Sequence, residues 1–154
     1  MGLLNHHFTS QEDLVAAAYE EISMRYHHTL RARVEADTQN QDSPIKTLVA
    51  CAFEEGIMCP DQLRAWVVFW SKTIDSAVMR AAHDRINERL QSYLIDVLKQ
   101  SLPNSKADLR VLAIEYSALA DGLWLDWSLN GTHQTSELWQ TILNQWLERT
   151  LSLG

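Results

Sequence analysis

Tryptophan is the residue type whose number and spacing in this sequence most directly suggest chemistry. The six tryptophans form three pairs whose spacings of four, three and seven residues place each pair near one face of a helix. Aromatic faces attract a cation by about 0.5–2 kcal/mol per ring, and a nearby carboxylate can supply the counter-charge. Asp121 lies one turn before Trp124, so this region could bind a quaternary ammonium or a similar cation. The pairs are Trp66/Trp70, Trp124/Trp127 and Trp139/Trp146.

The same side chains also have an explanation as packing residues. Each tryptophan can bury a large area in a core or a dimer interface, and the last pair lies on a helix rich in leucine. Asp121 could instead cap or hydrogen-bond a neighbouring helix where Gly122 permits a close approach. Glu115 is a second carboxylate candidate. The sequence leaves open whether the rings line a cavity or fill the core.

Motifs for catalysis and metal binding are missing. There is no Glu followed three residues later by His, no His-Glu-x-x-His, no Gly-x-Ser-x-Gly, no Cys-x-x-Cys and no phosphate-binding glycine loop. The pairs His6-His7 and His27-His28 are adjacent residues, which point about 100° apart on a helix, so surface or groove positions are favoured over metal ligation. We therefore expect no enzyme activity, no metal and no cofactor.

Composition sets the class of protein. A chain of 154 residues makes one domain, and its net charge of −7 argues against this chain alone holding a nucleic-acid backbone. No apolar run is longer than the six residues at 65–70, which is far too short to span a membrane. Cys51 and Cys59 lie on different predicted helices, so we interpret them as two small apolar side chains and not as a redox pair. No signal peptide is apparent. We expect a cytoplasmic protein with no membrane contact.

Apolar residues recur with a period of 3.6 between the few prolines and glycines, and no stretch alternates with period two. The sequence therefore predicts an all-α protein. Thr9 with Glu12 predicts a capping box at the first long helix, and Ser105 with Asp108 gives a weaker version of the pattern. Ser43 followed by Pro44 predicts another helix start. The expected helices are 9–37, 43–56, 60–75, 77–102, 105–130 and 134–151, with a short helix or its remnant at 2–7.

Several segments together resemble the TetR family of bacterial regulators. Residues 2–14 (GLLNHHFTSQEDL) resemble the end of its helix-turn-helix and the start of its fourth helix. Residues 64–71 (RAWVVFWS) and the pattern of 85–103 resemble the effector domain of BetI-like members. The strongest motif is ALADGLWL at 118–125, which ends in Leu-Asn-Gly at 129–131. The order of these segments matches the family.

This resemblance implies a transcriptional regulator, in the BetI-like case a repressor. Residues 1–8 would be a remnant of the DNA-recognition helix, and 9–154 an effector-binding and dimerisation domain. The first two helices of the family's reader have no counterpart here, so we expect operator binding only if they are restored. The alternative is a reader-less, stand-alone ligand-binding or interaction protein that pairs with a full-length regulator. The expected DNA-contact remnant consists of Leu4, Asn5, His6 and His7.

The resemblance also implies a small-molecule effector and a homodimer. It places the helix at 60–75 against the effector cavity, and the helix at 9–37 between that cavity and the DNA reader. The aromatic residues would suit a cationic effector, in a pocket formed by Trp66, Trp70, Trp124, Asp121 and Phe53. The family's dimer mode pairs the last two long helices of each subunit in a four-helix interface. The expected interface residues are Leu123, Trp127, Trp139, Ile142, Leu143 and Trp146.

Overall fold

The computed structural model describes residues 10–37, 39, 41–54, 57, 59–130 and 136–154, and every regular element in these ranges is an α-helix. The predicted all-α class is confirmed, and each of the six long helices is present. Their bounds are α1 Gln11–Ala36, α2 Pro44–Ala50, α3 Pro60–Thr73, α4 Ala77–Ser101, α5 Leu109–Asn130 and α6 Ser136–Leu151.

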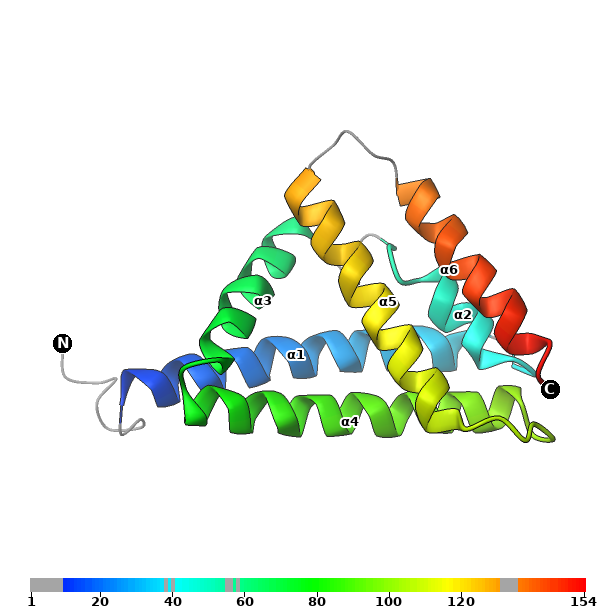
Figure 1. The fold of residues 1–154 in the computed structure, drawn as a ribbon, viewed down its shortest axis with the longest axis horizontal. Coiled ribbons are helices and arrows are strands. Elements are labelled where there is room, and N and C mark those ends of the chain that lie inside the picture. Colours follow the sequence, from blue (N-terminus) through cyan, green and yellow to red (C-terminus); the bar gives the residue numbers. More distant parts are fainter. Residues whose placement is uncertain (1–9, 38, 40, 55–56, 58, 131–135) are drawn as a thin grey trace.

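The two long helices α1 and α4 lie side by side and run in the same direction (Figure 1). Cross-links between residues 64 or 65 positions apart fix this parallel arrangement. Tyr19 Oη and His83 Nδ1 are 2.9 Å apart, and Arg85 pairs with Glu20. Helices α3 and α5 rise from this base and α6 packs beside α5, so that α1 and α4 form one edge of a roughly triangular molecule.

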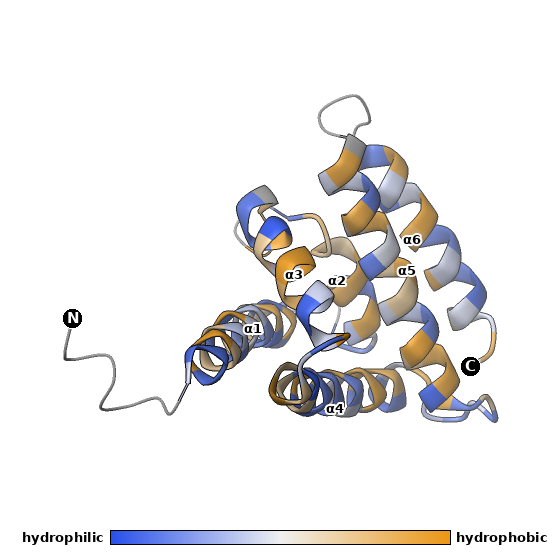
Figure 2. Cartoon of the chain, turned by 60° about the vertical axis from the view of Figure 1, so that its left-hand side comes forward, coloured by the Kyte–Doolittle hydropathy of each residue, from blue (hydrophilic) through white to orange (hydrophobic). Residues whose placement is uncertain are grey.

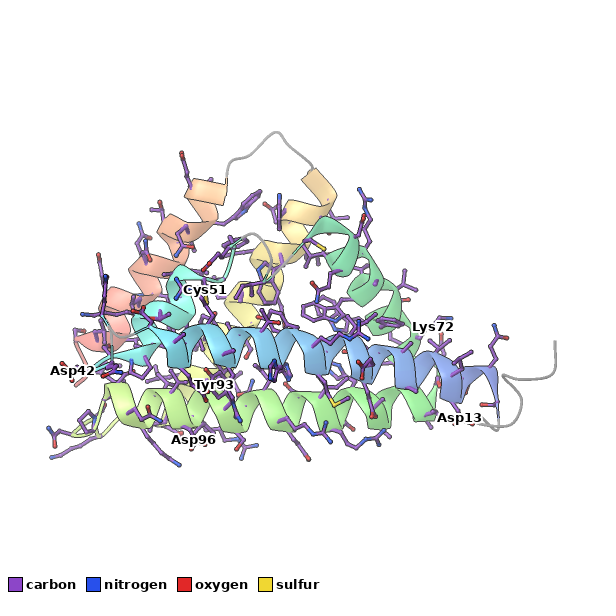
Figure 3. The ribbon with its side chains drawn as sticks, turned by 180° about the vertical axis from the view of Figure 1, so that it is seen from behind. Asp13, Asp42, Cys51, Lys72, Tyr93 and Asp96 are labelled. Atoms are coloured by element: carbon purple, nitrogen blue, oxygen red, sulfur yellow. The ribbon has the colours of Figure 1, made fainter. Side chains whose placement is uncertain are left out.

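The hydrophobic core lies between α1, α4 and the helices above them. Seen from behind, side chains fill the space between α1 and the rest of the bundle (Figure 3). Leu30, Leu48 and Leu94 are almost completely buried. Each such side chain contributes about 1.5–3 kcal/mol through burial, so the fold is held by one continuous apolar core.

Two helices begin at residues other than those predicted, because a different side chain caps each of them. Ser10 is the N-cap of α1, and its Oγ accepts a hydrogen bond from the Asp13 amide at 3.1 Å. Thr9, the predicted cap, lies outside the described residues. At α5, the Asp108 carboxylate accepts from the Arg110 amide at 2.9 Å, so the helix begins after Asp108 and not at Ser105.

Helix α2 is shorter than the predicted 43–56. Ser43 and Pro44 do start it, with Pro44 at the first position, but the helix ends at Ala50. A succession of turns follows, in which the Glu54 amide donates to the Cys51 carbonyl at 3.0 Å. These turns direct the Ala52 carbonyl toward α5.

Candidate functional site

A cavity of about 60 Å³ lies among α1, α3, α4 and α5. It contains both predicted kinds of group, aromatic rings and a carboxylate. Each of the four helices contributes at least two side chains, so the cavity depends on how the whole bundle packs. Its lining comprises Tyr19, Ser23, Tyr26, His27, Trp66, Trp70, His83, Ile86, Asn87, Leu90, Asp121 and Trp124.

The rings pack in a connected cluster at one side of this cavity. Trp66 lies 6.2 Å from Trp70 and 5.9 Å from Trp124 between ring centroids. Tyr26 meets both Trp66 and Trp124 edge to face, at 5.0 and 5.7 Å. The three tryptophans predicted for the pocket therefore do come together, and a void remains beside them.

A hydrogen-bonded chain runs along one wall. The Trp70 indole donates to Tyr19 Oη at 3.2 Å, and Tyr19 is in turn joined to His83 Nδ1. Burial raises the pKa of Tyr19 to about 12, so its hydroxyl stays protonated at neutral pH. This chain links α3 through α1 to α4.

Asp121 is the only carboxylate among the described residues of the lining. It is partly buried, and burial raises its pKa from 3.8 to about 6, so it is mostly ionised at neutral pH. Among the described residues it has no hydrogen-bond or ion-pair partner, and no lysine or arginine lines the cavity. The cavity therefore holds a negative charge in a partly dehydrated space, with no counter-ion among the described residues.

Two further polar groups in the lining also lack partners. Ser23 Oγ and Trp66 Nε1 are buried and make no hydrogen bond within the described part of the chain. A buried polar group without a partner costs about 1–3 kcal/mol, so both favour a bound molecule that can hydrogen-bond. Sequence reasoning missed Ser23, although it lies one turn from Tyr19 and nearly one turn from Tyr26 on the same helix.

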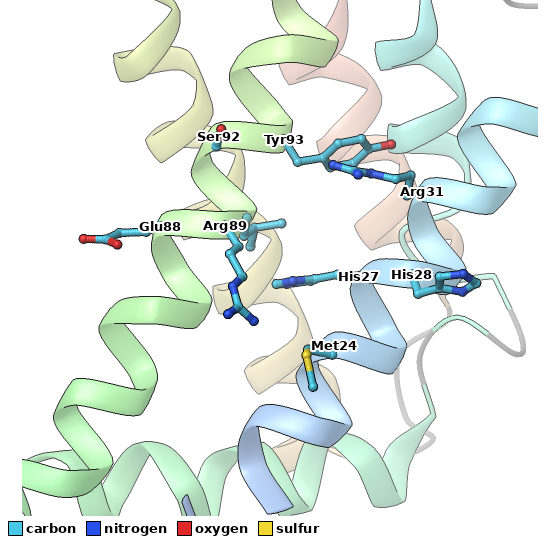
Figure 4. Close-up of a pocket in the computed structure, with 9 residues that line it drawn as sticks. Met24, His27, His28, Arg31, Glu88, Arg89, Ser92 and Tyr93 are labelled. Carbon is cyan, nitrogen blue, oxygen red and sulfur yellow. The ribbon is translucent and has the colours of Figure 1, made fainter. Parts of the chain in front are cut away.

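A larger groove of about 550 Å³ lies outside the cavity, between α1 and α4 (Figure 4). Arg31 extends over the ring of Tyr93, 4.8 Å from its centroid. His27 and Leu90 line both the groove and the cavity, so they separate the two. Burial, Arg89 and Arg31 lower the pKa of His27 to about 4, so this histidine is neutral at neutral pH.

Phe53 does not belong to the cavity, in contrast to the prediction. Because α2 ends early, Phe53 lies in the turn that follows it, next to α5 and α6. There its ring lies 6.1 Å from Trp127 and 5.9 Å from Trp139. Glu115 is exposed on α5 and does not line the cavity either.

Three of the predicted dimer residues are buried inside the subunit itself. Trp139, Leu143 and Trp146 are 1%, 0% and 3% exposed, so they offer no surface to a partner. The apolar face of α6 packs on α2 and α5 of the same chain, and the Trp139 indole donates to Asp126 at 3.1 Å. The other predicted interface residues, Leu123, Trp127 and Ile142, are partly exposed.

Helix α5 carries a different exposed apolar face, which we call the α5 stripe. Its members recur every three or four residues, and Figure 2 shows hydrophobic residues repeating along this helix. A Cβ added at Gly122 would meet nothing within 4 Å, so the predicted close approach to a helix of the same subunit is absent. The stripe consists of Val111, Ile114, Ala118, Gly122, Leu125 and Leu129, all exposed.

Leu4, Asn5, His6 and His7 lie outside the described residues, as does the boundary expected at residue 8. Both cysteines are free: Cys51 is buried, and burial raises its thiol pKa to about 12, whereas Cys59 is exposed. In the described residues no cluster of three or more His, Cys, Asp or Glu could hold a metal, and no helix could cross a membrane.

Comparison with known proteins identifies the family. Residues 45–152 match the family model described as BetI-type transcriptional repressor, C-terminal. The chain belongs to this family. A BetI regulator of Burkholderia mallei is 27% identical over 158 aligned residues, covering 98% of this chain and 76% of its own. A BetI regulator of Burkholderia ambifaria is also 27% identical, over 84% of this chain, which spans 66% of that relative's length.

A solved structure of a transcriptional regulator has the same fold. A candidate transcriptional regulator from Pseudomonas aeruginosa PAO1 superimposes with a TM-score of 0.87 at 28% identity. The match covers 98% of this chain and 74% of the other. The TetR-like resemblance stated from the sequence is therefore confirmed, and these relatives are regulators, the class that the sequence favoured over enzymes.

Proposed function

We propose that this chain is the effector-sensing and dimerising part of a cytoplasmic BetI-type repressor, and that its effector is a small cation. The observation that carries the proposal is the unpaired carboxylate of Asp121 beside the aromatic cluster. A cation in the cavity would supply the missing counter-charge and would meet the rings of Tyr26, Trp66, Trp70 and Trp124.

A neutral occupant would gain less from the same cavity. The charge on Asp121 is held in a partly dehydrated site, where an opposite charge interacts more strongly than it does in water. Perturbed carboxylates in concave sites are frequent features of functional sites. Burial against the aromatic cluster would add to the affinity of any ligand, but only a cation would use both features.

Helix α1 is the element through which we propose that the effector acts. It supplies Tyr19, Ser23, Tyr26 and His27 to the cavity, and its first residue, Gln11, leads back toward the predicted recognition helix. A ligand that contacts α1 can shift the position of the helix only by binding one position better than the other. Operator binding is part of the proposal only for a chain that carries the complete DNA reader.

For assembly we propose a two-fold homodimer built on α5 and α6, with the α5 stripe at its centre. A two-fold interface brings the same patch of both subunits together. Small residues at Ala118 and Gly122, in the middle of the stripe, would let two α5 helices approach closely. This arrangement keeps the two helices that were predicted to form the interface, but the exposed α5 stripe takes the place of the buried residues Trp139, Leu143 and Trp146.

Matched ligands test the charge requirement. Binding of choline and ethanolamine is compared by calorimetry with that of their neutral counterparts 3,3-dimethyl-1-butanol and ethylene glycol. At least one cation should bind more tightly than its counterpart, and Asp121→Asn should weaken that cation by about tenfold or more while sparing the neutral compound. Asp84→Asn, at an exposed position on α4, is the control. Equal losses for charged and neutral ligands would show that Asp121 is structural.

A further inference from the structure

We infer that the cavity recognises a protonated primary amine in preference to a quaternary ammonium. This inference rests on the proposed cationic effector and specifies its head group. Two independent observations lead to it: the size of the cavity and the hydrogen-bonding groups that face it.

The cavity is small for a fully methylated nitrogen. Its volume is about 60 Å³, less than half that of the ~150 Å³ engineered cavity that holds benzene. A trimethylammonium group is nearly spherical and presents bulk in every direction, so it would have to separate rings such as Trp66 and Trp124, which already lie 5.9 Å apart. An ammonium group on a single carbon is much narrower and could enter with little movement of the rings.

Two oxygen-bearing groups of the lining can accept hydrogen bonds, so they favour a ligand that carries donors. Ser23 Oγ is 1% exposed at the residue level and has no partner among the described residues, so it can accept. The Asp121 carboxylate is also without a hydrogen bond there, and in its ionised form it can only accept. A primary ammonium carries three N–H donors, which suffice for both groups, whereas a quaternary nitrogen has none.

The unpaired indole of Trp66 favours a polar group elsewhere on the same ligand. Its Nε1–H is a donor only and lacks an acceptor within the described chain. A hydroxyl or ether oxygen two bonds beyond the amine carbon would provide one. The rings attract either kind of cation, so the aromatic cluster does not discriminate between the head groups and the hydrogen bonds decide.

A methylation series at neutral pH tests the inference directly. Ethanolamine, N-methylethanolamine, N,N-dimethylethanolamine and choline are all cations there and differ in the number of N–H donors. Isothermal titration calorimetry on the wild-type chain should show affinity falling along the series, with ethanolamine binding at least about tenfold more tightly than choline. A tenfold ratio corresponds to the free energy of about one hydrogen bond.

Variants then assign the preference to a residue. Ser23→Ala should weaken ethanolamine and leave choline nearly unchanged, so that the ratio between them falls to about threefold or less. Ser92→Ala, in the outer groove, is the matched control and should keep the full ratio. A ratio that Ser23→Ala leaves intact would contradict the role of Ser23, and with it the inference.

The possible failures are distinguishable. Choline binding as tightly as ethanolamine or more tightly would overturn this inference and leave the proposed cationic effector standing. Absence of binding by all four amines would contradict both. The wild-type series gives these outcomes even if Ser23→Ala does not fold.

Discussion

Tyr26 stands edge-on to Trp66, with ring centroids 5.0 Å apart and planes at 87°. It meets Trp124 in the same manner, at 89°. Edge-to-face pairs contribute about 0.5–1.5 kcal/mol each beyond the area that they bury. One ring of α1 is thus held by one ring of α3 and one of α5, all at the wall of the cavity. A ligand that moves any of these rings therefore acts on α1.

The two tryptophans that hold Tyr26 should respond differently to the same substitution. The Trp124 indole donates to the Ala52 carbonyl at 3.1 Å, whereas the Trp66 indole has no partner in the described structure. Phenylalanine removes a similar area at both positions, but only Trp124→Phe leaves a buried carbonyl unpaired. Trp124→Phe should therefore cost about 1–3 kcal/mol more than Trp66→Phe in the free energy of unfolding, measured by urea denaturation. Equal costs would contradict the assigned bond.

Removing the charge of Asp121 should stabilise the unliganded protein. Burial raises the pKa of this carboxyl from 3.8 to about 6, so the folded state holds its proton more tightly than the unfolded chain does. Stability is then lost as pH rises between about 4 and 6, and at neutral pH the ionised group costs about 1–3 kcal/mol.

Asp121→Asn should recover that stability at neutral pH and change little below about pH 4, where the carboxyl is neutral in both states. Thermal unfolding without ligand at both pH values measures the difference. Asp84→Asn, at an exposed site, should change neither. A gain that persists unchanged at low pH would mean that the charge is not its cause.

The affinity for a cation should depend on pH through the same carboxyl. Above about pH 6 Asp121 is ionised and affinity should be constant, while well below that value affinity should fall up to tenfold per pH unit. The other titratable groups in the lining are Tyr19 and Tyr26, whose pKa values burial raises, and His27, whose pKa is lowered to about 4, together with His83. Calorimetry across this range on the wild type and on His83→Gln separates Asp121 from His83. A profile that His83→Gln abolishes would assign the dependence to the histidine.

Hydrophobic periodicity was enough to predict the helices because it depends on which face of each helix is buried. Helix α4 was expected at 77–102 and spans Ala77–Ser101. Helix ends were harder to predict, because several side chains near each end could cap it, and the choice between Ser10 and a neighbour depends on local backbone geometry. The end of α2 depends on turns that periodicity does not reveal.

The cavity residues were predictable where they lie on regular helices. Trp66 and Trp70 are one turn apart, and Asp121 and Trp124 share a motif on a neighbouring helix, so their meeting followed from the fold. Phe53 lies in a turn, whose direction the sequence pattern did not specify. Ser23 was missed because a serine in a helix usually bonds its own backbone or faces solvent, and its missing partner is visible only in three dimensions.

The burial of Trp139, Leu143 and Trp146 inside the subunit could not be predicted from the sequence, because an apolar helix face does not reveal which surface covers it. The face of α6 that contains Trp139 and Trp146 is covered by α2 and α5 of its own subunit. Helix α5, in contrast, is apolar on two sides. One side packs on α3, α4 and α6, and the other is the exposed α5 stripe.

A charge in the α5 stripe should separate the subunits without unfolding them. Ala118 is exposed at the middle of the stripe, so Ala118→Arg should change the stability of a single subunit by no more than about 0.5 kcal/mol. In a two-fold interface the new charge would face its own copy across the axis, and two buried like charges without partners oppose association. Analytical ultracentrifugation should show a dimer at micromolar concentration for the wild type and a monomer for Ala118→Arg.

Two comparison variants make this dimer test specific to the α5 stripe. Val68→Arg changes an exposed apolar residue on α3, 54% accessible, and should leave the dimer intact. Trp146→Ala removes a core side chain, so it should cost about 3–5 kcal/mol of folding stability and not selectively produce a folded monomer. A wild-type chain that is monomeric at micromolar concentration, or an Ala118→Arg variant that remains dimeric, would place the subunit contact elsewhere or remove it.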